Sequence, residues 1–188
     1  MYAARIALLV VLGLKPVLAE VPVAEPEGYR TEAYRARVPS QLSGARTVTT
    51  TLAHAIWKSG EAAFIDVLPR PPRPTNLPAG TIWRERDHLD IPGSLWLPDT
   101  GYGELASGME QYFRIGLELA SGGDKDKLLV IYCQRDCWMS WNAAKRALAL
   151  GYRRVAWYPD GTDGWQQAEL PMQVARPMPG RPGEYRPE

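Results

Sequence analysis

Short apolar runs alternate with amphipathic segments along the chain, and the apolar runs predict the strands. Residues 128–133, LLVIYC, are apolar throughout, which is typical of a central strand covered on both faces. Residues 62–67, AAFIDV, form a similar run with Asp66 near its end. The β-branched stretch 47–51 predicts an edge strand, and residues 154–158, RVAWY, predict a strand that enters a turn.

The segments between these runs have the spacing of helices. In residues 52–60 the apolar positions share one helical face, and Gly60 ends the pattern. Residues 104–121 and 139–151 have the same periodicity, and residues 162–170 predict a last short helix. Strands that alternate with helices predict an α/β domain, in which a mainly parallel central sheet has helices on both faces.

The first segment of the chain, residues 1–19, has the pattern of a secretory signal peptide. Arg5 precedes an apolar run at 6–14, and Ala19 makes a suitable cleavage site before Glu20. The apolar run is too short to span a bilayer core of about 30 Å, although an uncleaved anchor or a core helix is an alternative. We therefore expect export to the periplasm. No twin-arginine pair precedes the run, so we expect export in the unfolded state, without a bound cofactor.

The remaining chain divides into three parts. Residues 20–44 are rich in Pro, Arg and Tyr and lack periodicity, so we expect an extended arm that lies on the domain. Residues 45–170 contain the predicted strands and helices, and we take them as a single domain. Residues 171–188 are rich in Pro and Arg and predict an irregular tail.

Composition and charge exclude some classes of partner. The 188 residues are 45% apolar and 23% charged, as expected of one globular domain. The formal net charge is +1, which gives no electrostatic reason to expect nucleic acid, or a membrane surface once the signal peptide is removed. Two cysteines are too few for a disulfide framework.

Those two cysteines, Cys133 and Cys137, stand where the central strand ends and the next helix begins. Sites in parallel sheets form beyond the carboxyl ends of the strands. Loop N–H groups, a helix N-terminus and Arg135 all favour negative charge there, so we expect a lowered pKa at Cys133 and predict that it is the nucleophile. The predicted substrate-binding loop consists of Gln134, Arg135, Asp136 and Trp138.

Two other interpretations of the pair stay open. Thiols oxidise outside the cytoplasm, and the spacing of Cys133 and Cys137 permits a structural disulfide. A CxxxC pair could also bind Cu(I) or Zn²⁺, with His54 or His88 as a further ligand, and His88 lies in the loop that can approach the site.

Two neighbours of the pair have expected supporting roles. Asp66 ends a buried strand, and we expect it to hydrogen-bond loop backbone as a supporting residue of the site. Trp138 directly follows Cys137 in the sequence and could form a wall of the substrate pocket.

Four segments in order resemble the rhodanese family, over about residues 44–170. They are AAFIDV with its acid, HLDIPGSLWLP, which is similar to the family's GHIPGAxxIP, the strand LLVIYC, and GYRRVAWYPDGTDGW, which is similar to GYxxVxxLxGGxxxW. The resemblance implies a rhodanese-like fold and a sulfurtransferase. In it, the Cys133 thiolate takes sulfane sulfur from thiosulfate or a persulfide donor and passes it to a thiol or cyanide.

The loop departs from the family pattern in two respects. A typical rhodanese loop contains Gly and ends in Arg, whereas Trp138 occupies the sixth position here and Arg135 lies only two residues after Cys133. The missing terminal Arg argues against a phosphatase and against the small dianion thiosulfate, and favours a bulky or protein-bound donor. Cys137 could resolve a persulfide on Cys133 and leave a disulfide, or the two could shuttle electrons as a dithiol.

A narrower resemblance concerns the CQRDCW segment and the arm GYRTEAYRARVPSQLSGA. Both look like parts of exported rhodanese-like proteins with a CxxxCW motif that accompany catabolism dependent on pyrroloquinoline quinone (PQQ). This resemblance implies a periplasmic setting and a quinoprotein alcohol dehydrogenase or its cytochrome as partner, with no cofactor in this chain. A non-catalytic docking or maturation factor and a Cu(I)-binding protein are the alternatives that it leaves open.

Overall fold

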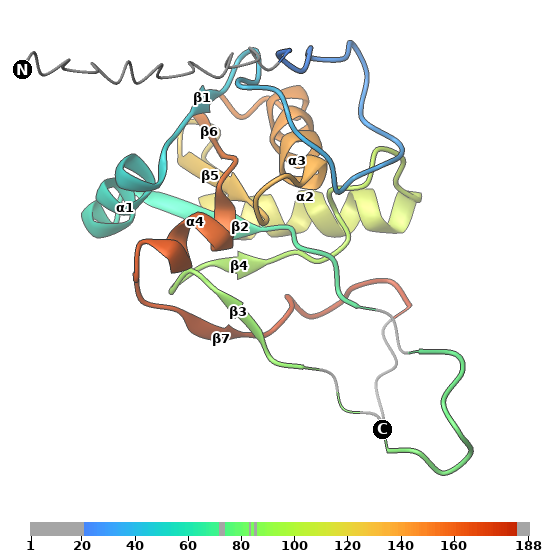
Figure 1. Ribbon diagram of the computed structural model, residues 1–188. Coiled ribbons are helices and arrows are strands. Elements are labelled where there is room, and N and C mark those ends of the chain that lie inside the picture. Colours follow the sequence, from blue (N-terminus) through green and yellow to red (C-terminus); the bar gives the residue numbers. More distant parts are fainter. Residues whose placement is uncertain (1–20, 72–73, 83, 85, 184–188) are drawn as a thin grey trace, which may run out of the picture.

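Five parallel strands form the central sheet of the computed structural model, which describes residues 21–71, 74–82, 84 and 86–183. The strand order is β1-β6-β5-β2-β4, so β5, the strand that leads to Cys133, is central (Figure 1). The strands are β1 (Arg46–Thr47), β2 (Ala62–Asp66), β4 (Leu95–Trp96), β5 (Leu128–Tyr132) and β6 (Val155–Tyr158).

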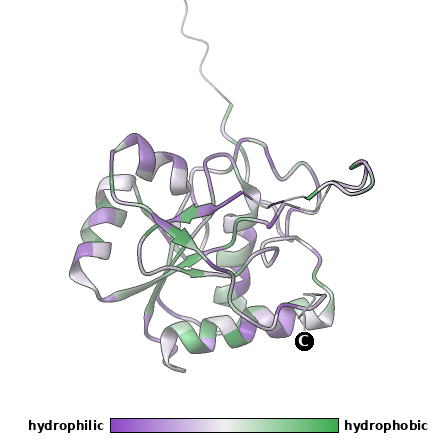
Figure 2. Ribbon diagram, turned by 90° about the horizontal axis from the view of Figure 1, so that it is seen from below, coloured by the Kyte–Doolittle hydropathy of each residue, from purple (hydrophilic) through white to green (hydrophobic). Residues whose placement is uncertain are grey.

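Four helices cover the two faces of this sheet, as predicted. They are α1 (Thr50–Ser59), α2 (Ser107–Ser121), α3 (Trp138–Ala149) and α4 (Gly161–Gln167). Alternate residues of β5 serve opposite faces: Leu129 and Ile131 belong to the core cluster under α2 and α3, while Val130 and Tyr132 belong to the cluster under α1 and α4. Figure 2 shows the hydrophobic strands between helices whose outer sides are hydrophilic.

The first strand is shorter than the sequence predicted. The β-branched stretch 47–51 favoured a strand, but β1 ends at Thr47. Thr49 is the N-cap of α1, and its Oγ1 accepts a hydrogen bond from the Leu52 N–H. A threonine that caps a helix satisfies a backbone donor that would otherwise be unpaired, so the following threonines enter the helix.

The predicted irregular tail contains a strand. Strand β7 (Gln173–Ala175) pairs antiparallel with β3 (His88–Asp90) in a separate two-stranded ribbon. A three-residue strand has no recognisable period, and its partner lies more than 80 residues earlier in the chain, so local sequence could not predict it. The ribbon also places His88 in a strand and not in the expected loop.

Residues 21–44 run as an extended arm along α3, in blue in Figure 1. Asn142 holds the arm by donating to the Arg30 carbonyl oxygen and accepting from the Arg30 N–H. Lys145 Nζ donates to three successive carbonyl oxygens, those of residues 26–28. The arm is therefore bound to the helix that begins at the cysteine loop.

The predicted signal peptide, residues 1–19, lies outside the described residues. Within the described part of the chain, no helix has both the length and the apolar character needed to cross a membrane.

Candidate functional site

The two cysteines lie at opposite ends of the loop between β5 and α3. Cys133 follows the last residue of β5, and Cys137 is the N-cap residue of α3. Both are free thiols, and their sulfur atoms are 2.6 Å apart. This separation exceeds the roughly 2.05 Å of a disulfide bond and is well within reach of one. The loop therefore brings the predicted nucleophile and its neighbour into direct contact, close enough for a disulfide to form between them.

The first half of the loop is fixed to α4. The Cys133 carbonyl oxygen accepts from the Thr162 N–H at 3.0 Å, and Gln134 pairs with Gly161 in an isolated bridge. Gly161 has φ of 50°, and a Cβ there would collide with the Cys133 carbonyl group. Glycine is thus needed at this position both for its backbone conformation and for the close approach of the loop.

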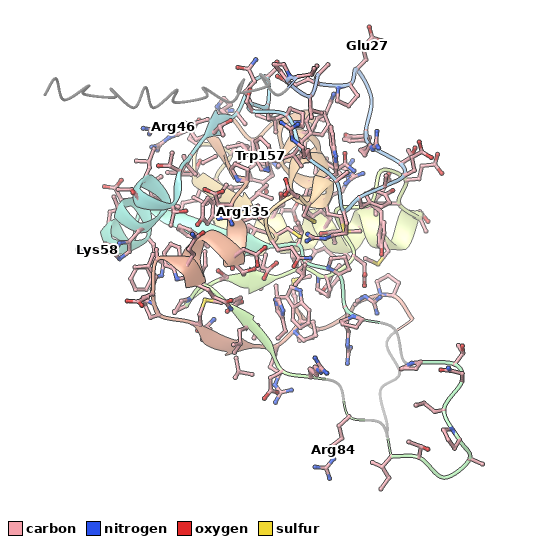
Figure 3. All side chains as sticks on the ribbon, in the orientation of Figure 1. Glu27, Arg46, Lys58, Arg84, Arg135 and Trp157 are labelled. Carbon is pink, nitrogen blue, oxygen red and sulfur yellow. The ribbon has the colours of Figure 1, made fainter. Side chains whose placement is uncertain are left out.

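Arg135 does not supply its charge to the thiols. Its side chain lies beside α4, where it contacts Asp160 and Gln167 (Figure 3). Its N–H donates to Asp163 Oδ2 at 3.1 Å. Asp136, next in the loop, adopts a positive φ of 52°, which turns the chain back toward α3. The predicted role of Arg135 as a cation beside the nucleophile is therefore not what this geometry supports.

The second half of the loop is fixed to the arm. The Trp138 N–H, at the N-terminus of α3, donates to the Tyr34 carbonyl oxygen at 2.9 Å. Arg35 Nη1 donates to the Arg135 carbonyl oxygen at 2.9 Å. An arm carbonyl thus occupies one of the helix donors that would otherwise attract an anion. Sequence reasoning described the arm but could not identify these contacts.

The structure reverses the expected acidity of the two thiols. Burial raises the pKa of Cys133, and its hydrogen bond to Cys137 and the charge of Asp66 raise it further. For Cys137, the hydrogen bond that it shares with Cys133, the Met139 N–H and Arg35 lower the pKa to about 7, against the effect of burial. The prediction of a lowered pKa at Cys133 is wrong because its side chain is fully enclosed.

A pocket of about 380 Å³ opens onto Cys137. Cys133 is not part of its lining and is 0% exposed. Trp138, predicted as a pocket wall, is also absent from the lining, because it packs against Trp141 and under Arg30. The pocket is lined by Tyr34, Arg35, Leu68, Pro69, Pro71, Tyr102, Gln134, Cys137 and Met139.

Asp66 holds a backbone segment that lines the pocket. Its Oδ1 accepts from the Leu68 N–H at 2.7 Å, as expected of a residue that holds loop backbone. Its Oδ2 lies 2.7 Å from Nε2 of His88, whose ring packs against Trp96. Burial raises the pKa of Asp66, and the hydrogen bond and charge of His88 act in the opposite direction. Asp66 thereby fixes the segment that provides Leu68 and Pro69 to the pocket.

Neither histidine joins the cysteine pair. His88 is bound to Asp66, and His54 packs against the rings of Trp57 and Trp165. Among the described residues, no three His, Cys, Asp or Glu side chains lie close enough together to hold a metal ion. A metal at this site would have only the two cysteines as protein ligands of these types.

Comparison with known proteins places this site in a family. The sequence model of the rhodanese-like domain matches residues 49–168, which include the four segments that resemble this family but not the arm that carries the narrower resemblance. A search of curated proteins found no match.

Three solved structures illustrate what the chain resembles in the search of known structures. A thiosulfate sulfurtransferase from Pseudomonas aeruginosa is 20% identical with a TM-score of 0.48, over 71% of this chain and 21% of that one. A polysulfide-sulfur transferase homodimer from Wolinella succinogenes is 17% identical with a TM-score of 0.45, over 70% and 80%. EanB in complex with hercynine is 22% identical with a TM-score of 0.48, over 74% and 33%. This chain thus spans about a fifth of the Pseudomonas protein and a third of EanB.

Proposed function

The chain belongs to the rhodanese-like family, and we propose that it transfers sulfane sulfur through the Cys133–Cys137 pair. The observation that carries the proposal is the dithiol itself, with its sulfur atoms 2.6 Å apart at the carboxyl end of a central parallel strand. A pocket reaches one of the two thiols. An activated thiol that faces a pocket can accept sulfane sulfur, and a second thiol in contact with it can release that sulfur as sulfide.

The reaction starts when a thiolate of the pair attacks the outer sulfur of a donor RSSH. The S–S bond of the donor breaks, RS⁻ leaves as the thiol RSH, and the protein carries a persulfide. The persulfide sulfur can then pass to an acceptor thiol. Alternatively, the second cysteine displaces it as hydrogen sulfide and the pair is oxidised to a disulfide, which an external dithiol must reduce.

The pocket favours an organic or protein-bound donor over thiosulfate. Most of its lining is apolar or aromatic, and among the described residues that line it Arg35 is the only cation. The Trp138 N–H is bound to the arm and the Arg135 N–H to Asp163, so neither can cradle a dianion. A donor with an apolar body fits this lining better than a small, strongly hydrated dianion.

We place this activity in the periplasm, alongside PQQ-dependent alcohol oxidation. The support is the signal-peptide pattern at residues 1–19, the CxxxCW motif and the arm sequence. The proposed partner is a quinoprotein dehydrogenase or its cytochrome. Fractionation of cells that express a C-terminally tagged chain tests the location: mature protein that begins at Glu20 in the periplasmic fraction is expected. Full-length protein in the cytoplasmic fraction would contradict export.

The activity itself is tested by intact mass spectrometry with thiols trapped. Protein reduced beforehand is mixed with cysteine persulfide or, in parallel, with thiosulfate, and released sulfide is measured. We expect a gain of about 32 Da, or a loss of about 2 Da with one sulfide released, with cysteine persulfide and much less with thiosulfate. The double variant Cys133→Ser/Cys137→Ser is the control and should show neither change. Unchanged mass of the wild type with both donors would refute sulfur transfer and favour a docking role.

A further inference from the structure

We propose that the two cysteines act in the reverse of the order that the loop position implies: Cys137 attacks the sulfur donor, and Cys133 is the resolving thiol. This inference rests on the proposed sulfur transfer and assigns a role to each cysteine. It makes Cys137 the catalytic residue that meets the substrate.

Access to the two sulfur atoms is the first argument. Cys137 is one of the residues that line the pocket, whereas Cys133 is not. Cys133 lies behind it, 0% exposed, within the core cluster under α2 and α3. Cys137 is itself only 2% exposed, so a donor reaches it through the pocket and not from open solvent. A donor would have to displace Cys137 to reach Cys133.

Stabilisation of the attacking anion is the second argument. Two groups outside the pair favour negative charge on Cys137: the Met139 N–H at the start of α3, and Arg35 of the arm. Among the described residues, Cys133 has one such donor, the Gln134 N–H, and no cation, and it is buried more completely while the Asp66 carboxylate repels negative charge on it. The thiolate form is the nucleophile, so the first attack belongs to Cys137.

The resolving step follows from the contact between the two sulfur atoms. After Cys137 accepts the sulfane sulfur as Cys137–S–SH, Cys133 attacks Cys137 Sγ. The Cys133–Cys137 disulfide forms, the S–SH bond breaks, and HS⁻ leaves with the proton that Cys133 gives up. The sulfane sulfur gains two electrons and the two thiols lose two. The cycle closes when a dithiol reductant, such as dithiothreitol in the assay, restores both thiols.

The single variants distinguish the two orders. With cysteine persulfide, Cys133→Ser should accumulate a stable gain of about 32 Da and release no sulfide, because its persulfide has no resolving partner. Cys137→Ser should take up sulfur at least ~10-fold more slowly. Trypsin cleavage after Arg135 places the cysteines on separate peptides, 128–135 and 136–145, so the persulfide can be assigned. A persulfide on Cys133 in Cys137→Ser, with none in Cys133→Ser, would overturn the order and leave sulfur transfer intact.

A measurement on the wild type keeps the test independent of variant folding. Fully reduced protein is treated briefly with iodoacetamide at pH 7 and digested with trypsin. Peptide 136–145 should be alkylated at least ~10-fold faster than peptide 128–135. Faster alkylation of 128–135 would contradict the proposed order, whereas failure of wild-type sulfur transfer with cysteine persulfide would instead remove the function on which the order rests.

Discussion

Two buried titratable pairs lie at the carboxyl end of the same sheet and have different consequences. Cys133 and Cys137 lie in the loop after β5, whereas Asp66 is the last residue of the neighbouring strand β2 and is bonded to His88 of β3. In each pair, one member is fully enclosed and bonded to a partner. The dithiol opens onto a pocket of about 380 Å³, whereas His88 reaches a hollow of about 60 Å³.

The difference shows that burial and a close partner do not by themselves make a reactive site. Both Asp66 and Cys133 have a pKa raised by burial. Only the dithiol has a second member, Cys137, that combines a lowered pKa with access to a substrate-sized space. We therefore assign chemistry to the dithiol and a structural role to the carboxylate–imidazole pair.

The largest expected effect comes from breaking the support of the dithiol loop at Gly161. In Gly161→Ala, the new Cβ would meet the Cys133 carbonyl group and the backbone would keep an unfavourable positive φ. We expect a loss of about 3 kcal/mol in the free energy of unfolding, measured in urea, together with slower alkylation of Cys137. Gly60→Ala is the matched control, because Gly60 has φ of 69° with open space around it, and about 1 kcal/mol is expected there. Equal losses in the two variants would contradict the close approach.

The second-largest expected effect tests the Asp66–His88 pair. His88→Ala leaves the buried Asp66 carboxyl with its Leu68 N–H but without the imidazole. We expect a loss of about 2 kcal/mol at neutral pH, because a buried carboxyl group loses the imidazole that is hydrogen-bonded to it. Alkylation of Cys137 should change less than ~2-fold. A large change in thiol reactivity with unchanged stability would reverse the roles assigned to the two pairs.

A third prediction concerns Asp90, which lies in β3 beside the structural pair. Burial raises its pKa from 3.8 to about 7, although the charge of His88 acts in the opposite direction. Between about pH 4 and 7 the unfolded chain has released this proton and the folded chain retains it, so rising pH lowers stability. The loss is on the order of 2 kcal/mol. Urea unfolding at pH 5 and pH 7 should show a smaller decrease for Asp90→Asn than for wild type, and identical decreases would disprove this assignment.

The smallest effect tests how the arm acts on the dithiol. Arg35→Ala removes a charge and a hydrogen bond that favour the Cys137 thiolate. Because Arg35 is largely exposed, we expect only about 3-fold slower alkylation at pH 7, and no difference at pH 9. Arg46→Ala removes an exposed arginine from β1, at the far edge of the sheet, and should leave the rate unchanged. A uniform slowing at both pH values would indicate displaced backbone rather than lost charge.

Local pattern was sufficient to predict the central layer of the fold. The apolar run LLVIYC and the helix after it identify β5, α3 and the position of both cysteines, because buried parallel strands have a recognisable composition. Strand β7 could not be predicted, because it depends on a partner in the distant β3. Local sequence could not predict which of the two cysteines attacks and which resolves. These roles depend on Tyr34 and Arg35 of the arm, which contact the loop across about a hundred residues.

The contacts between the arm and α3 also constrain the order in which the chain folds. Lys145 binds the carbonyl oxygens of residues 26–28 from 117 to 119 residues away, and Asn142 and Arg30 are separated by 112. Such contacts close very long loops. The arm has no surface to bind until α3 has packed on the sheet, so we expect the arm to dock after the rest of the domain has formed. The arm is thus synthesised before the domain but is among the last segments to reach its native position. Until it does, Cys137 lacks Tyr34 and Arg35 above it, and the newly folded domain passes through a stage in which this thiol is open to oxidants and to wrong disulfide partners.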